Sequence, residues 1–283
     1  MIGPGRAFAC NARKLMFMNF KGAARREGLY DRLYSLEWGE TTTNNYGFAP
    51  ASGHQPERFQ IQLYIELLKL LNHRFSQGRV AHALEISCGR GGGLEHLARH
   101  LPLTTKIIGL DSSRHAIEFC KKRYAAMTNL SFTRGHALNL PFDDSAFDLV
   151  VSVEASHVYG DDMGFLREVR RVLRPSGWFL IADYRARRKV PLLEELACAA
   201  GLAGELRDIT PNVVSACELD AERRRRIIRA GLPWYSRPLL TSSLEGYSAL
   251  PGTLNFERFR SGDRMYFLSC MIPTQQHSAA MSY

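Results

Sequence analysis

The chain has 283 residues, of which 45% are hydrophobic and 23% are charged. These proportions are typical of a soluble globular protein, not of a disordered or fibrous one. No run approaches the roughly 18 uninterrupted apolar residues of a membrane-spanning helix, so the sequence excludes a transmembrane protein. It does not exclude contact with a membrane surface.

The balance of charge is basic, with 37 Lys and Arg against 28 Asp and Glu, a net charge of +9. Such a balance suits an anionic partner, but ordinary solvated faces explain it as well. Six basic residues precede the first acidic one: Arg6, Arg13, Lys14, Lys21, Arg25 and Arg26. This stretch lacks the apolar region of a secretory signal, so no secretory signal is expected, whereas an organellar transit peptide stays open.

The six cysteines are scattered and form no C-x-x-C pair. They are Cys10, Cys88, Cys120, Cys198, Cys217 and Cys270. This spacing argues against a zinc site and against a disulfide-linked secreted scaffold. We therefore expect no bound metal and a cytoplasmic location, with association at a membrane left open.

Along the chain, a helical pattern at 59–71 precedes an alternation of short apolar runs with helical periods. Strands are predicted at 83–87, 106–110, 130–133, 147–153 and 178–182, and helices at 94–100, 113–126 and 165–173. Alternation with continuous apolar strands indicates a parallel sheet that is buried on both faces. After Tyr184 the pattern is mostly helical up to Pro233, residues 264–270 form a last strand, and the end of the chain from Pro273 is expected to fray.

A glycine-rich stretch, Gly89 to Gly93, joins the first predicted strand to a helix. Glycines let a ligand approach the main chain, and the helix N-terminus offers unpaired N–H groups, so a nucleotide-like ligand is expected at the carboxyl end of the sheet. The dinucleotide pattern G-x-G-x-x-G requires a third small residue where this chain has Leu94. The dinucleotide interpretation is weakened accordingly.

Two acidic residues favour another ligand. Glu85 stands four residues before Gly89, where a carboxylate can hold an ammonium, and Asp111 ends the second strand, where a carboxylate can accept both hydroxyls of a ribose. S-adenosylmethionine carries both a free amino acid and a nucleoside. Its sulfonium is already electrophilic, so a protein must mainly position the methyl group against a nucleophile.

Over residues 80–184 the sequence resembles the class I S-adenosylmethionine-dependent methyltransferases. The resemblance rests on 85–93, 109–111, 135–142, 147–150 and 173–177. Residues 87–93, 153–157 and 264–266 are further similar to the mycobacterial phthiotriolone and phenolphthiotriolone dimycocerosate methyltransferases. The resemblance implies an α/β, Rossmann-like class I methyltransferase fold: a central, mostly parallel seven-stranded sheet with helices on both faces, and a helical lid.

The resemblance also implies a division of the chain. Residues 1–54 form an N-terminal, cofactor-covering region, 55–184 the S-adenosylmethionine-binding core, 185–272 a helical lid and substrate region with the last strands, and 273–283 a flexible tail. The expected cofactor site comprises Glu85, Ser87, Gly89, Gly91, Asp111, Ser112, His136, Ala137 and Glu154. His136 departs from the family, which usually has an Asp there; a neutral imidazole can accept the hydrogen bond of the adenine amino group, or the contact is lost.

Three further features carry two interpretations each. His157 follows the fourth strand and either takes a proton from an attacking hydroxyl, because imidazole titrates near working pH, or only orients groups and shapes the pocket. The aromatic residues Tyr30, Tyr34, Trp38 and Tyr46 either cover the cofactor or belong to a core helix. The arginines at 223–226, followed by Leu232, Trp234 and Tyr235, form either a lid that touches a membrane or a solvated helix.

The expected activity is methylation of a small lipophilic acceptor, a polyketide, lipid or quinone-like molecule, on a hydroxyl or enol oxygen. Alternatives are methylation of carbon on a sterol or quinone-type substrate and a cyclase that uses the same fold without methyl transfer. RNA methylation is disfavoured because the Asp/Asn-Pro-Pro-aromatic element of many base methylases is missing after the fourth strand. Nucleic acid is therefore not expected as a partner, and a homodimer is left open.

Overall fold

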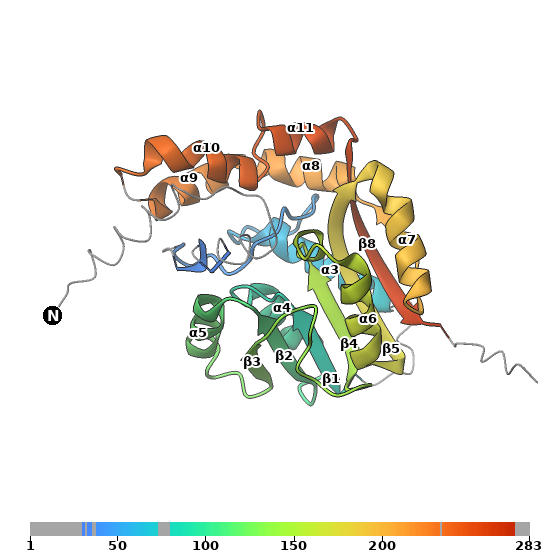
Figure 1. Cartoon of the computed structure of the whole chain (residues 1–283). Coiled ribbons are helices and arrows are strands. Elements are labelled where there is room, and N and C mark those ends of the chain that lie inside the picture. Colours follow the sequence, from blue (N-terminus) through green and yellow to red (C-terminus); the bar gives the residue numbers. More distant parts are fainter. Residues whose placement is uncertain (1–29, 32, 36–37, 73–79, 233, 275–283) are drawn as a thin grey trace, which may run out of the picture.

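A computed structural model describes residues 30–31, 33–35, 38–72, 80–232 and 234–274 (Figure 1). The six early basic residues, Cys10, Pro233 and the predicted tail after residue 274 lie outside the described residues. The division of the chain into four segments stays a prediction. Within the described ranges, none of the helices combines the length and the apolar character needed to cross a bilayer.

A single sheet organises the described part of the chain. Its strands are β1 (His82–Ile86), β2 (Lys106–Asp111), β3 (Leu130–Arg134), β4 (Phe147–Val153), β5 (Leu173–Ala186), β6 (Leu202–Ala203), β7 (Arg207–Asp208) and β8 (Arg264–Pro273). Seven strands follow the order β3-β2-β1-β4-β5-β8-β6, and the two-residue β7 pairs with β8 beside this path. The pairs among β1 to β5 are parallel, whereas β8 runs antiparallel to its neighbours, so the expected mostly parallel sheet is confirmed.

Helices cover both faces of this sheet (Figure 1). They are α3 (Arg58–Asn72), α4 (Gly92–His100), α5 (Arg114–Arg123), α6 (Asp162–Val172) and α7 (Val190–Ala199). Along β1 the side chains alternate between two separate apolar clusters: Ala83 packs with residues of α3 and α4, and Leu84 with residues of α6 and α7. This alternation follows from the period of two along a strand. Both faces are therefore buried, as the continuous apolar runs predict.

Local caps position the helices that follow the strands. Ser113 accepts a hydrogen bond from the amide of Ala116 (3.1 Å) and begins α5 directly after β2. Asp161 accepts from the amide of Gly164 (2.8 Å) and begins α6. Because β1, β2 and β4 are parallel, their carboxyl ends meet at one edge of the sheet, where a ligand site is expected.

A second layer of helices lies beyond that edge. It contains α8 (Thr210–Leu219), α9 (Ala221–Gly231), α10 (Arg237–Tyr247) and α11 (Leu254–Arg260), and the segment that begins at Tyr30 lies between this layer and the sheet (Figure 1). Leu33 of that segment packs with Ile228 of α9 and Leu244 of α10. The predicted helical region after Tyr184 is confirmed, whereas α10 and α11 were not predicted.

The arginine run at 223–226 does not form one uniform charged face, because two of its members point inward. Arg224 is 7% exposed, pairs with Asp220 (3.0 Å), and donates to the carbonyl of Tyr46 (2.6 Å) and that of Ser248 (2.9 Å). Arg223 also pairs with Asp220 (2.6 Å). These two arginines therefore connect α9 to the N-terminal segment and to the end of α10, and they offer no charge to a membrane.

Candidate active site

A cavity opens at the carboxyl edge of β1, β2 and β4; we call it the cofactor cavity. Its empty volume, which includes space open to solvent, is about 900 Å³. Most of the residues predicted for the cofactor site line it: Ser87, Gly89, Asp111, Ser112, His136, Ala137 and Glu154. Glu85 and Gly91 are not among the lining residues. The predicted site therefore forms one continuous surface apart from these two.

The glycine-rich turn serves two purposes. Gly89 has φ +54°, and a Cβ there would come within 2.7 Å of the Tyr34 hydroxyl, so the N-terminal segment approaches the turn closely. Gly91 has φ +77°, and a Cβ there would meet Tyr124 and the sulfur of Cys120. Gly91 therefore packs the turn against α5 on the side away from the cavity, and its role is conformational.

Asp111 is the last residue of β2, and its carboxylate faces the glycine-rich turn. It is 6% exposed, and its Oδ2 and Oδ1 accept from the amides of Gly89 (2.9 Å) and Ser113 (2.8 Å). Burial raises its pKa, and the hydrogen bonds from these amides oppose the rise. Each carboxylate oxygen has capacity for a second donor. Asp111 is thus held rigidly in the cavity wall and is able to accept hydroxyl groups of a ribose.

Glu85 lies beside the cavity, in contact with the lining residue Tyr64. Its side chain is buried, and the Tyr64 hydroxyl donates to its Oε1 (2.7 Å). Its Oε2 is buried without a hydrogen-bond partner, and burial raises the pKa of Glu85 to about 8. A buried acceptor without a partner costs free energy that a cationic ligand would recover. The carboxyl groups of Asp111 and Glu85 therefore fit a nucleoside that carries an ammonium group.

His136 also lines this cavity, but its geometry revises its expected role. The amide of Leu138 donates to its Nδ1 (3.1 Å). In a neutral ring the proton is then on Nε2, which makes this nitrogen a donor. His136 in this form cannot accept a hydrogen bond from an adenine amino group, but it can donate to a ring nitrogen.

A second cavity, of about 880 Å³ empty volume, adjoins the first; we call it the acceptor cavity. Its apolar wall contains Leu33, Trp38, Ile227, Ile228 and Leu244, from the N-terminal segment, α9 and α10. The two cavities share Tyr30, Tyr34, Thr42, Thr43, Asn44 and Glu154. The shared part is polar. The rest of the lining combines these apolar side chains with polar and charged ones, among them Gln60, Arg90, Arg223 and Arg224.

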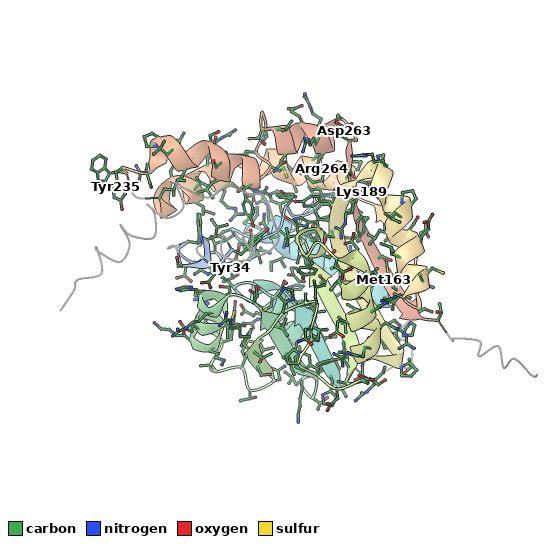
Figure 2. The ribbon with its side chains drawn as sticks, viewed as in Figure 1. Tyr34, Met163, Lys189, Tyr235, Asp263 and Arg264 are labelled. Atoms are coloured by element: carbon green, nitrogen blue, oxygen red, sulfur yellow. The ribbon has the colours of Figure 1, made fainter. Side chains whose placement is uncertain are left out.

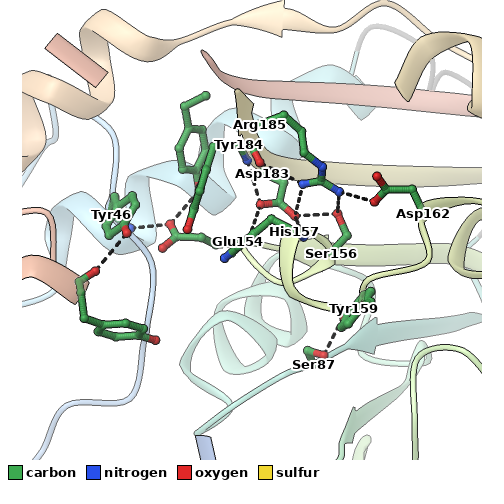
Figure 3. A network of polar contacts seen from close by, with 12 residues as sticks. Tyr46, Ser87, Glu154, Ser156, His157, Tyr159, Asp162, Asp183, Tyr184 and Arg185 are labelled. Carbon is green, nitrogen blue, oxygen red and sulfur yellow. Dashed lines mark hydrogen bonds and ion pairs between the residues drawn. The ribbon is translucent and has the colours of Figure 1, made fainter. Parts of the chain in front are cut away.

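Glu154 is the titratable carboxyl group in this shared wall. Its Oε2 accepts from the amide of Tyr46 (2.7 Å) and the hydroxyl of Tyr266 (2.9 Å), and its backbone has a positive φ of 51° (Figure 3). Burial raises its pKa to about 8 against these hydrogen bonds. Glu154 is thus mostly protonated near neutral pH, and it occupies a sparsely populated backbone conformation of the kind that clusters at functional sites.

His157 belongs to a buried polar network next to the cavities (Figure 3). Its Nδ1 lies 2.7 Å from Oδ1 of Asp183. The other oxygen of Asp183, Oδ2, accepts from the hydroxyl of Ser156 (2.6 Å) and lies 3.4 Å from Nη1 of Arg185. Burial raises the pKa of Asp183, but the charges of His157 and Arg185 and these hydrogen bonds hold it well below its usual range. An ionised Asp183 keeps the proton of neutral His157 on Nδ1 and leaves Nε2 as an acceptor.

The position of His157 differs from expectation in one respect. It is not a lining residue of either cavity, although its neighbours Ala155 and Val158 line the cofactor cavity. Its side chain is 14% exposed, and its ring lies 4.1 Å from that of Tyr184. A role in proton transfer therefore requires Nε2 to reach the cavity from its rim.

The N-terminal aromatic residues predicted to cover the cofactor line the cavities. Tyr30 and Tyr34 line both, whereas Trp38 and Tyr46 line the acceptor cavity. Tyr34 lies between the helical layer and the sheet (Figure 2). Asp31 fixes this segment to the start of α5, accepting from the hydroxyl of Ser113 (2.6 Å). The covering interpretation fits this geometry, and Tyr46 also enters an aromatic cluster with Tyr184, Phe259 and Tyr266.

Several site residues escaped the sequence analysis. Asp183, Tyr64, Asn44 and Tyr247 are the main ones, and Asn44 donates to the Tyr247 hydroxyl (2.7 Å) across the shared wall. Asp183 had a sequence signal, because it ends the apolar run of the fifth strand as Asp111 ends the second. Among the described residues, no group of three or more His, Cys, Asp or Glu is arranged to hold a metal ion.

Comparisons with known proteins identify the family of this chain. Residues 84–181 match a family model described as a methyltransferase domain. The phthiotriol/phenolphthiotriol dimycocerosates methyltransferase of Mycobacterium tuberculosis is 34% identical over 208 residues, which cover 73% of this chain and 74% of that protein. The fatty-acid O-methyltransferase of Mycolicibacterium smegmatis is 32% identical over 243 residues, 86% of this chain and 84% of that protein.

A solved structure shares the fold. The phosphoethanolamine N-methyltransferase 2 of Haemonchus contortus, solved in complex with S-adenosyl-L-methionine, has a TM-score of 0.64 and 17% identity, over 87% of this chain and 57% of that one. At this identity the likeness concerns the fold alone. Together with the family match and the two relatives, it shows that this chain belongs to the class I S-adenosylmethionine-dependent methyltransferases, in the family of the phthiotriol/phenolphthiotriol dimycocerosates methyltransferases, with S-adenosylmethionine as its cofactor.

Proposed function

We propose that this enzyme methylates an oxygen atom of a small lipophilic acceptor. The observation that carries the proposal is the acceptor cavity, which contains a group of apolar side chains and shares a polar wall with the cofactor cavity. An acceptor with an apolar chain and one hydroxyl group would place the chain among Trp38, Ile227 and Leu244 and the hydroxyl beside Glu154 and Asn44. The names of the two relatives support a lipid acceptor, and one of them names oxygen as the methylated atom.

Residues of the cofactor cavity and its surroundings would bind the cofactor. Asp111 would accept the ribose hydroxyls, the unpaired oxygen of Glu85 would balance the ammonium, and His136, which lines the same cavity, would lie beside the base. When bound, S-adenosylmethionine supplies a methyl group on a positively charged sulfur. Tyr30 and Tyr34 cover both cavities and exclude water from the space between them.

Oxygen methylation releases a proton, and two groups are candidates to take part in its removal: Glu154 in the shared wall, and His157, which lies outside the lining of both cavities. The His157–Asp183 pair is organised as a base, because Asp183 is ionised and holds Nδ1. Glu154 faces the acceptor cavity directly, but with a pKa of about 8 it is mostly protonated near pH 7 and is a better donor than acceptor. We therefore assign proton removal to His157 and orientation of the acceptor oxygen to Glu154.

Identification of the product tests this proposal. The full-length protein is incubated with S-adenosylmethionine labelled in the methyl group and, separately, with a long-chain alcohol, a long-chain fatty acid, a quinol, a sterol and total RNA. Mass spectrometry and NMR then locate the label. We expect the label on oxygen of an acceptor with a long apolar chain, and Ile228→Glu, which places a charge in the apolar wall, to abolish transfer while leaving S-adenosylhomocysteine binding intact.

Three results would contradict oxygen methylation. Label on carbon of the sterol or quinol would indicate a C-methyltransferase, and label in RNA alone would assign a nucleic acid substrate. A rearranged acceptor without label would indicate a cyclase.

A further inference from the structure

Three large apolar side chains are exposed together where α9 turns into α10. Trp234 is 79% exposed, Tyr235 42% and Leu239 57%. The rings of Trp234 and Tyr235 lie edge to face, 5.9 Å apart. Figure 2 shows Tyr235 at the outer end of this helical layer, pointing away from the body of the molecule. We call these three residues the α9–α10 corner.

The surroundings of this corner are basic. Residues 221–240 contain six arginines and a single acidic residue, Glu222. Arg223 and Arg224 turn inward to Asp220, whereas Arg226, Arg229 and Arg237 are exposed. Among the described residues, Glu222 forms an ion pair with Arg226 (3.2 Å), and the remaining exposed charge near the corner comes from arginines.

The two helices that flank the corner also line the acceptor cavity. Ile227 and Ile228 of α9 and Leu244 of α10 line the cavity from the inside, and Trp234, Tyr235 and Leu239 lie outside both cavities. The same two helices thus present apolar residues to the acceptor on one side and an aromatic, basic corner to the exterior on the other.

We propose that the α9–α10 corner docks onto the surface of an anionic lipid bilayer. Trp and Tyr favour the headgroup level of a bilayer because their rings combine an apolar body with a polar edge, and exposed arginines add attraction to anionic lipids. A second copy of this chain would present the same positive charge, which disfavours a symmetric contact. The purpose of this docking rests on the proposed function. If the acceptor is a lipid, a bilayer would deliver it directly to the helices that line the acceptor cavity.

Flotation with lipid vesicles tests the docking without any acceptor. The full-length protein is mixed with vesicles of phosphatidylcholine alone or with about one third phosphatidylglycerol. We expect it to float with the anionic vesicles. Replacing Trp234, Tyr235 and Leu239 with Ser together should weaken this binding by roughly tenfold or more, since the buried apolar area is lost. Arg226→Gln with Arg229→Gln and Arg237→Gln should remove the preference for anionic vesicles.

Leu103→Ser is the matched control, because Leu103 is 87% exposed and follows α4 in the sheet domain. It should float as the wild type does. All variants should bind S-adenosylhomocysteine with unchanged affinity, since none of these residues lines the two cavities. Vesicle binding is measured without methyl transfer, so its outcome is separate from that of the proposed function.

The proposal is overturned if the wild type does not float, or if Leu103→Ser loses binding as much as the triple Ser variant does. It is also overturned if the wild type is a dimer that the triple Ser variant dissociates, which would assign the corner to a second copy. Binding of total RNA by the wild type and by the triple Ser variant is measured in parallel. If the triple Ser variant lost RNA binding but kept vesicle binding, the corner would be assigned to nucleic acid.

Discussion

Two carboxylates at the ends of neighbouring strands differ in how completely their oxygens are paired. Both oxygens of Asp111 accept backbone amides, whereas Glu85 keeps one oxygen buried without a partner. Asp111 therefore shapes the turn as well as the ribose site, and Glu85 is left to be satisfied by the ligand. Different substitutions test these two roles.

Asp111→Ala should weaken S-adenosylhomocysteine binding by about 1.5–3 kcal/mol, because it removes charge-assisted hydrogen bonds to the ribose and leaves the amides of Gly89 and Ser113 without an acceptor. Titration calorimetry measures the change. Asp144→Ala is the control, since Asp144 is 79% exposed, pairs with Arg171 and lines neither cavity. It should leave the affinity for S-adenosylhomocysteine unchanged. Equal affinities for the Asp111 variant and the wild type would contradict the site.

Glu85 predicts release of a proton when the ligand binds. With its pKa raised to about 8, the free enzyme holds Glu85 mostly protonated at pH 7, and an ammonium beside it would ionise it. Calorimetric titrations with S-adenosylhomocysteine in buffers of different ionisation enthalpy should therefore show release of close to one proton, and Glu85→Gln should abolish this release. A wild type that releases no proton would place the ammonium elsewhere.

Site residues could be predicted from the sequence when they lie at the end of a strand that the sequence pattern shows. Glu85 and Asp111 were found because they lie at the ends of predicted strands. Asp183 obeys the same rule and could have been found, but its pairing with His157 joins residues 26 apart in sequence and depends on the register of β4 and β5. The packing of Gly91 against Tyr124 and Cys120 depends on tertiary contacts that no local pattern contains. The tautomer of His136 follows from the amide of Leu138, two residues away, but the sequence does not show which backbone turn brings the two together.

At the scale of elements, the strands and the helices of the sheet layer were predictable because they combine apolar periodicity with clear ends. Helix α10 escaped because its sequence contains Thr241, Ser242, Ser243 and Gly246, which have low helix propensity, and its apolar face is limited to Leu240, Leu244 and Tyr247. Helix α11 is only seven residues long. Tertiary packing of a few apolar residues, rather than propensity, defines both helices.

Neighbouring arginines in helix α9 differ in burial and therefore in their expected contribution to stability. Arg224→Met should destabilise the protein by about 3 kcal/mol, the lower end of the usual cost of breaking a buried pair, because Arg223 still neutralises Asp220. The carbonyls of Tyr46 and Ser248 also lose a donor. Arg226→Met, at a side chain 75% exposed, should change stability by less than about 0.5 kcal/mol. Urea denaturation that finds equal effects would refute the inward role of Arg224.

At the scale of the whole molecule, the buried carboxyl groups link stability to pH. Folding raises the pKa of Glu85 and of Glu154 from 4.5 to about 8, so the folded state binds their protons more tightly than the unfolded state. This contribution is fully present below about pH 4.5 and is lost as the pH rises through 8.

The melting temperature of the ligand-free enzyme should therefore fall between pH 6 and pH 8.5, and the isosteric Glu154→Gln should make this fall shallower. Differential scanning fluorimetry across the range is sufficient. A wild type whose stability rises over this interval would mean that both carboxyl groups are ionised in the folded protein.

The rate of a single turnover, with labelled S-adenosylmethionine and a saturating lipophilic alcohol, tests most directly whether His157 removes the proton during oxygen methylation. His157→Gln should lower this rate by about 10²–10⁴-fold while S-adenosylhomocysteine affinity stays the same. Glu154→Gln, which keeps a donor in the shared wall, should lower it far less. The assignment would be contradicted if His157→Gln kept the full rate while Glu154→Gln lost it, since proton removal would then belong to the carboxyl group between the two cavities.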